Sequence, residues 1–126
     1  MVIDTSILLA IFFNEKAGAW ALDRLQESAD SLRMSTVNYA EALTLIEDRQ
    51  PQLFDEIRNS IRSSSIRLVA PTPAQAEIAA AARLRYPPNL GDCFAYALAR
   101  QEDCPLLTLD RDFRNTDIPV ILPKTV

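Results

Sequence analysis

The chain has 126 residues, a formal net charge of −4 and an apolar content of 48%, which fits one soluble domain with a sizeable core. It contains no histidine and only two glycines, which excludes Ser-His-Asp and Cys-His nucleophiles, His-ligated zinc and glycine-rich phosphate-binding loops. The chemistry must therefore come from carboxylates, hydroxyls, arginines and any hard metal ion that the carboxylates hold.

The first half of the chain predicts strands alternating with helices. "MVID" is rich in β-forming residues and leads into an apolar stretch typical of a buried helix. After "LRMS", Ser35 or Thr36 can cap the next helix. The predicted elements are a strand at residues 1–4, helices at 5–13 and 15–29, a strand at 32–35, a helix at 37–49 and another that begins at Pro51.

The second half continues the same alternation. Thr72, Pro73 and Gln75 form a good helix entry, with a cap, a first-turn proline and a capping-box partner. The predicted elements are a strand at 66–69, this helix, a helix at 93–101 that Asp92 can cap, and strands at 105–109 and 118–122. This order predicts a three-layer α/β/α sandwich with a mainly parallel central sheet, in a single domain over residues 1–126.

Two further features bear on the compartment. The longest apolar run, "ILLAIFF", is too short to span a bilayer and lacks the flanks of a secretory signal, so we expect a cytoplasmic protein. Cys93 and Cys104 share no metal-binding or redox spacing, and we expect them to be reduced, packed thiols.

Three apolar segments each contain a single acid. Asp4 is the only charged residue before Glu15, Glu41 the only one in residues 37–46, and Asp92 the only one in residues 87–99. A buried, unpaired carboxylate is costly. Asp92 can be explained as a helix cap and Asp4 as an acceptor for backbone N–H groups, whereas a mid-helix glutamate has no such role.

"TLDRDF" adds Asp110 and Asp112 directly after a predicted strand, in a turn where aspartate is common. Ligands of parallel α/β sheets bind beyond the carboxyl ends of the strands, where Asp4 and Asp110 fall. Several carboxylates gathered there would repel one another unless a cation lay between them, and Mg²⁺ or Mn²⁺ suits such oxygen ligands. Such an ion activates water and offsets charge on a phosphate.

The motifs "MVIDTSILL", "STVNYAEAL", "NLGDCFAYALA" and "PLLTLDRDF" resemble, in order, the four acidic motifs of PIN-domain ribonucleases. The likeness covers essentially the whole chain and is strongest to the VapC-type toxins of VapBC toxin–antitoxin pairs. It implies a PIN fold and cleavage of RNA that depends on Mg²⁺ or Mn²⁺. It also implies a VapB-type antitoxin as partner, and a homodimer.

Carried over position by position, the resemblance assigns metal-binding and catalytic roles to the acids and supporting roles to two hydroxyls. It leaves open whether Asp110 or Asp112 lies nearer the metal. Similar toxins often have a longer glycine-rich and basic stretch before the "GD" motif, which this chain lacks. The metal ligands implied are Asp4, Glu41, Asp92, Asp110 and Asp112, and the hydroxyls are Ser6, which orients the first aspartate, and Thr108.

Three alternatives remain at this point. A catalytically silent PIN-like binding module would keep the fold without turnover, although the chain retains all four acidic positions. A receiver-type phospho-acceptor domain needs a lysine near the site, and the sequence has only Lys16 and Lys124. Cleavage of DNA by the same metal chemistry is also open, because no motif identifies the 2′-hydroxyl.

Overall fold

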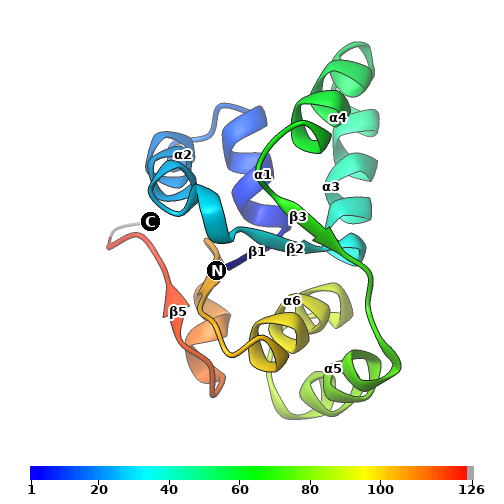
Figure 1. Ribbon diagram of the computed structural model, residues 1–126, viewed down its shortest axis with the longest axis vertical. Coiled ribbons are helices and arrows are strands. Elements are labelled where there is room, and N and C mark those ends of the chain that lie inside the picture. Colours follow the sequence, from blue (N-terminus) through cyan, green and yellow to red (C-terminus); the bar gives the residue numbers. More distant parts are fainter. Residues whose placement is uncertain (125–126) are drawn as a thin grey trace.

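A central sheet of five short parallel strands, in the order β3-β2-β1-β4-β5, divides the molecule (Figure 1). The computed structural model describes residues 1–124. The strands are β1 (Val2–Ile3), β2 (Arg33–Ser35), β3 (Arg67–Val69), β4 (Leu106–Leu107) and β5 (Val120–Ile121).

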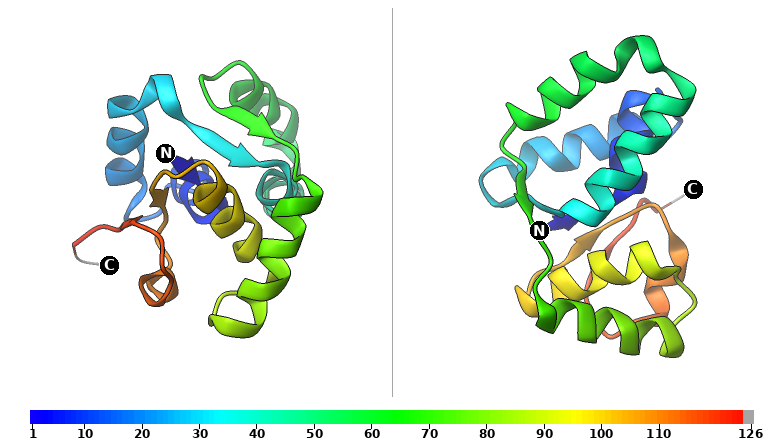
Figure 2. Two further views of the ribbon diagram at one scale, coloured as in Figure 1. Left: turned by 60° about the horizontal axis from the view of Figure 1, so that its bottom comes forward. Right: turned by 90° about the vertical axis from the view of Figure 1, so that its right-hand side faces the viewer.

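Helices cover both faces of the sheet, so the predicted three-layer α/β/α architecture is confirmed (Figure 2). The helices are α1 (Thr5–Phe12), α2 (Gly18–Glu27), α3 (Thr36–Arg49), α4 (Phe54–Arg62), α5 (Pro73–Arg85) and α6 (Leu90–Gln101), with short 3₁₀ turns η1 (Ala29–Ser31), η2 (Pro51–Leu53) and η3 (Arg111–Asn115). None of the helices in residues 1–124 has the length and apolar character needed to cross a membrane.

Alternate residues of the central strands enter two separate cores. Ile3 of β1 and Leu107 of β4 pack with α1 to α4, whereas Val2 and Leu106 pack with α5, α6 and the buried ring of Phe113. This is the period-two alternation of a strand that is buried on both faces. Both cysteines are unpaired thiols, Cys93 buried and Cys104 half-buried, as predicted.

The predicted helix entries are partly confirmed. Ser35 accepts the N–H of Val37 (3.2 Å) to begin α3, and Thr72 accepts the N–H of Gln75 (3.1 Å) to begin α5. The predicted capping box is wrong, because the Gln75 amide donates across the interface to Gln101 of α6 (2.7 Å). The Gln75 side chain, which the local sequence assigns to the cap, therefore forms a contact between α5 and α6 instead.

The predicted start of α6 is also wrong. The helix begins at Leu90 rather than at residue 93, and Asn89 is its cap, because the Asn89 Oδ1 atom accepts the N–H of Asp92 (2.9 Å). Asp92 thus lies in the first turn of the helix. Its carboxylate is left available for other contacts.

The turn between α1 and α2 is longer than predicted, because α1 ends at Phe12 and α2 begins at Gly18 rather than at residue 15. Asn14, two residues after the last residue of α1, lies in the left-handed region with φ 53°. A Cβ at Gly18 would lie 2.6 Å from the Ala10 carbonyl oxygen, so only glycine permits this approach to α1. The turn is therefore fixed against the end of α1.

Candidate functional site

Asp4 lies directly after β1, at the carboxyl edge of the sheet, and is only 2% exposed. Its Oδ1 atom accepts hydrogen bonds from the Ser6 hydroxyl (2.5 Å) and the Ser6 N–H (3.1 Å), and Oδ2 accepts one from the Thr108 hydroxyl (2.5 Å). Burial raises the pKa of Asp4 to about 6, although these hydrogen bonds favour the charged form.

The two hydroxyls join the ends of β1 and β4. Ser6 Oγ accepts the N–H of Leu109 (3.0 Å), and Thr108 Oγ1 accepts the N–H of Asp110 (3.0 Å). Their oxygen atoms are 3.4 Å apart. The residues predicted to support Asp4 therefore also set the path of the chain that carries Asp110.

Glu41 is held in the middle of α3 by two polar side chains. Its Oε1 atom accepts hydrogen bonds from the Thr5 hydroxyl (3.0 Å) and the Asn38 amide (2.9 Å). The same amide donates to the Gly91 carbonyl of α6 (3.0 Å), so buried Asn38 links the helices of two acids.

Gly91 gives Glu41 its space. A Cβ at this position would lie 2.1 Å from Glu41 Oε2 and 2.8 Å from Oε1. The Glu41 carboxylate therefore lies against the backbone of Gly91, the residue directly before Asp92. Any larger residue here would have to displace the carboxylate.

The charges of the other three acids all act on Asp92. Its pKa is raised to about 7, first by burial and then by the charges of Asp4, Asp110 and Glu41 in that order, while a hydrogen bond with Asn89 opposes the rise. Carboxylates from three other segments of the chain thus act on Asp92. We call Asp4, Glu41, Asp92 and Asp110 the carboxylate cluster.

Asp112 has a different environment from Asp110. Asp110 caps η3 and accepts the N–H of Asp112 (2.9 Å), and its charge acts on Asp92. Asp112 is exposed to solvent. Of the two acids left open by the sequence, Asp110 is the one that belongs to the carboxylate cluster.

The cluster fits a hard divalent cation in its donor set and charge. Its oxygen ligands are of the type that Mg²⁺ and Mn²⁺ prefer, and a cation would relieve the repulsion that raises the pKa of Asp92. Within residues 1–124, no three acidic or cysteine side chains stand close enough together to form a complete metal site as they are. An ion held by this cluster would therefore require side-chain movement.

Sequence reasoning missed the residues that hold Glu41. Asn38 lies three residues before Glu41 in α3, but Thr5 and Gly91 touch Glu41 only because α1, α3 and α6 converge. Thr5 directly follows Asp4 in "DTS", Asn38 precedes Glu41 by three residues in "VNYAE", and Gly91 is one of two glycines in the chain. These positions are the features of the sequence from which the three residues could have been found.

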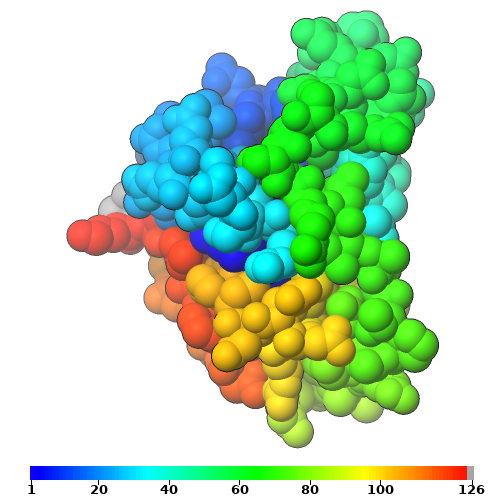
Figure 3. All heavy atoms as spheres, in the orientation of Figure 1, coloured from blue at the N-terminus to red at the C-terminus, as the bar shows by residue number. Residues whose placement is uncertain are grey.

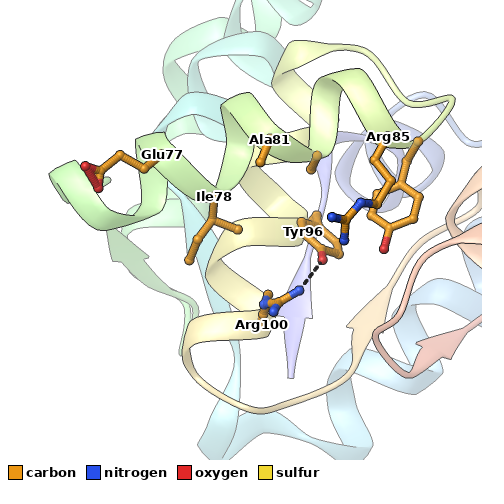
Figure 4. A pocket seen from close by; sticks show the side chains of 8 residues that line it. Glu77, Ile78, Ala81, Arg85, Tyr96 and Arg100 are labelled. Carbon is orange, nitrogen blue, oxygen red and sulfur yellow. Dashed lines mark hydrogen bonds between the residues drawn. The ribbon is translucent and has the colours of Figure 1, made fainter.

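A second polar group lies on the outer flank of α6, beside a cavity of about 330 Å³ between α5 and α6 (Figure 4). Tyr96 donates to Asp117 (2.5 Å), and Arg100 donates to both Tyr96 (2.9 Å) and Asp117 (2.7 Å). This group joins the segment before β5 to α6. No member of the carboxylate cluster lines the cavity.

Comparison with known proteins gives a consistent picture. The PIN domain family matches residues 1–119. Ribonuclease VapC42 of Mycobacterium tuberculosis is 34% identical over 127 residues, which cover 94% of this chain and 96% of that protein.

Two solved structures share the fold at lower identity. A toxin–antitoxin complex from Klebsiella pneumoniae has a chain with a TM-score of 0.78 and 21% identity, covering 99% of this chain and 98% of that one. VapC20 of Mycobacterium tuberculosis, described as a toxin that cleaves the sarcin-ricin loop, has a TM-score of 0.79 and 19% identity, covering 97% and 98%.

Proposed function

The chain belongs to the PIN domain family, and from this premise we propose that it is a metal-dependent endoribonuclease acting as the toxin of a toxin–antitoxin pair. The observation that carries the proposal is the carboxylate cluster, in which Asp4, Glu41 and Asp110 all raise the pKa of Asp92. The name of the relative VapC42, a ribonuclease, supports RNA as the substrate.

Asp4, Glu41, Asp92 and Asp110 would hold Mg²⁺ or Mn²⁺, with Asp112 at the margin of the site. When bound, such an ion lowers the pKa of a water molecule and offsets the negative charge that develops on the phosphate. Cleavage of this kind requires no histidine, in agreement with the composition.

The protein's own residues orient the carboxylates. Ser6 and Thr108 hold both oxygens of Asp4, and Thr5 and Asn38 hold Glu41 Oε1 while leaving Oε2 beside Gly91. Such partners of metal-binding groups fix ligand direction, and their loss costs about 10- to 100-fold in affinity or activity.

A protein partner belongs to the same proposal. The toxin–antitoxin complex from Klebsiella pneumoniae supports a VapB-type antitoxin that binds and silences this chain. A homodimer is the expected assembly of the free toxin. Co-expression and size-exclusion chromatography test both assignments.

The decisive experiment compares two glutamates of one helix. Glu41→Gln removes a charge from the carboxylate cluster, whereas Glu47→Gln makes the same change at an exposed position of α3. With Mn²⁺ and single-stranded RNA, we expect cleavage to be lost in Glu41→Gln and retained in Glu47→Gln, and EDTA to stop the wild type. Calorimetric titration with Mn²⁺ should show weakened binding only for Glu41→Gln.

Equal cleavage by wild type and Glu41→Gln, or cleavage that survives EDTA, would contradict the proposal. A wild type that binds RNA but never cuts it would favour the silent binding module. Faster cleavage of single-stranded DNA than of RNA would identify DNA as the substrate.

A further inference from the structure

A second cavity, of about 630 Å³, has in its wall Leu109, the residue before Asp110 of the carboxylate cluster. Its lining includes Lys16, Trp20, Leu109, Pro123 and Lys124, from the turn before α2, from α2, and from the segments after β4 and β5. Figure 3 shows the C-terminal segment projecting beside α2. The sequence has two lysines and one tryptophan, and all three line this cavity.

The cavity and the carboxylate cluster share one stretch of backbone. Leu109, in the cavity wall, stands between Thr108 and Asp110. Its N–H donates to Ser6 Oγ (3.0 Å), the atom whose own proton is donated to Asp4. If a phosphate of a polynucleotide lies at the carboxylate cluster, this cavity is therefore the neighbouring surface for the rest of the strand.

Both lysines stand on backbone that is held in place. The turn that carries Lys16 is closed by bonds from the Glu15 N–H to the Ala10 carbonyl and from the Gly18 N–H to the Glu15 carbonyl, each 2.9 Å. Lys124 follows a buried proline, Pro123. The lysines therefore flank a preformed recess.

The chemistry of the lining matches single-stranded nucleic acid. Proteins of this kind stack bases on aromatic rings and attract the phosphates with cations. Trp20 is partly exposed, and the Arg24 guanidinium carbon lies 5.9 Å from its ring centroid. Glu15 also lines the cavity, but the two lysines outnumber it. The volume is within the range of about 300–1,000 Å³ for small-ligand sites.

We propose that this cavity binds an unpaired nucleotide of the RNA next to the bond that is cut. The base stacks on Trp20, and Lys16 and Lys124 hold the flanking phosphates. This inference rests on the proposed ribonuclease function. It explains how a chain of net charge −4 attracts RNA, because this recess is lined by both lysines and by Leu109, the residue before Asp110.

Trp20 makes the proposal directly measurable, because it is the only tryptophan. We expect a 2′-O-methyl RNA hexamer, added to the wild type with Mg²⁺, to change the tryptophan fluorescence saturably. Lys16→Ala and Lys124→Ala should each weaken binding. Each should also reduce the slope of log affinity against log salt by about 0.7, the value for one phosphate contact of a single strand.

Labelled RNA and fluorescence anisotropy extend the test to Trp20. Trp20→Leu should weaken binding about 5- to 100-fold, as expected for one lost stacking contact, and Trp20→Phe should recover part of the loss. Arg62→Ala, at an exposed position of α4, is the matched control for charge removal and should leave the affinity within twofold of wild type. Circular dichroism checks the folding of each variant. If Trp20→Leu does not fold, the test of the proposal rests on the lysine variants.

The outcomes separate this inference from the function on which it rests. If the wild type cuts RNA and Glu41→Gln does not, but the lysine variants keep wild-type affinity and salt slope, the nucleotide site is wrong and the ribonuclease stands. If the wild type neither binds nor cuts RNA, both proposals fail. If a partner peptide changes Trp20 fluorescence and RNA does not, the cavity is a protein-docking site and the proposal is overturned.

Discussion

Replacement of Asp92 by asparagine should stabilise the metal-free protein while removing its activity. In the folded chain the pKa of Asp92 is raised to about 7, from an ordinary value of 3.8, by burial and by the charges of Asp4, Asp110 and Glu41. Ionised Asp92 is therefore unfavourable in the fold. Asparagine keeps the shape of the side chain and removes the charge.

The sign follows from proton binding. Between pH 3.8 and about 7 the folded chain holds a proton at Asp92 that the unfolded chain has released, so stability falls as pH rises through this window. The difference between the two pKa values corresponds to roughly 4 kcal/mol as an upper bound. Because Asp92 is partly exposed and solvent screens its neighbours, we expect about 1–2 kcal/mol.

The assay is thermal unfolding in EDTA at pH 4, 5.5 and 8. Asp92→Asn should unfold at a temperature higher than wild type by about 3–8 °C at pH 8, by less at pH 5.5, and by almost nothing at pH 4. Asp48→Asn, at an exposed position of α3, is the control and should match wild type throughout. Equal or lower stability of Asp92→Asn at pH 8 would refute the electrostatic account of the cluster.

Three further outcomes test the contacts around the cluster. Mn²⁺ at 100 times its dissociation constant should stabilise the wild type by about 2.7 kcal/mol and Asp92→Asn by much less, as measured by unfolding with and without EDTA. Gly91→Ala, which would place a Cβ 2.1 Å from Glu41 Oε2, should cost roughly 1–3 kcal/mol in denaturant unfolding and reduce RNA cleavage, whereas Leu90→Ala should leave cleavage unchanged. Tyr96→Phe removes the hydroxyl that bonds Asp117; it should cost about 1 kcal/mol of stability without slowing cleavage, and a large loss of cleavage would contradict the separation of the two sites.

The sequence was sufficient to predict the fold because the alternation within its strands and the order of its elements indicate the same architecture. Alternation within β1 and β4 sends Ile3 and Leu107 to one core and Val2 and Leu106 to the other, and the order of elements requires a parallel sheet. The errors fall where tertiary contact competes with local preference. Gln75 could close a capping box, but it bonds Gln101 instead.

For the site, the isolated acids were informative because an unpaired charge in an apolar segment is expensive. Asp4 and Glu41 could be identified in this way, but the distant residues that contact Glu41 could not. Thr5 and Gly91 lie 36 and 50 positions from it in the chain, and only the convergence of α1, α3 and α6 brings them together. Long-range approach of this kind leaves no periodic signal in the sequence.

Asp92 can be explained as a helix cap or as a metal ligand, and the contact made by Asn89 distinguishes between the two explanations. The side chain that caps α6 is that of Asn89, which accepts the N–H of Asp92 itself. A carboxylate in the first turn still gains about 0.3–1 kcal/mol from the helix dipole, which favours its charged form. The pKa of Asp92 nevertheless rises to about 7, so burial and the other three carboxylates outweigh the dipole. A charge held in place against that balance would stabilise the fold only with a cation beside it, which is the role that the proposed metal site gives to Asp92.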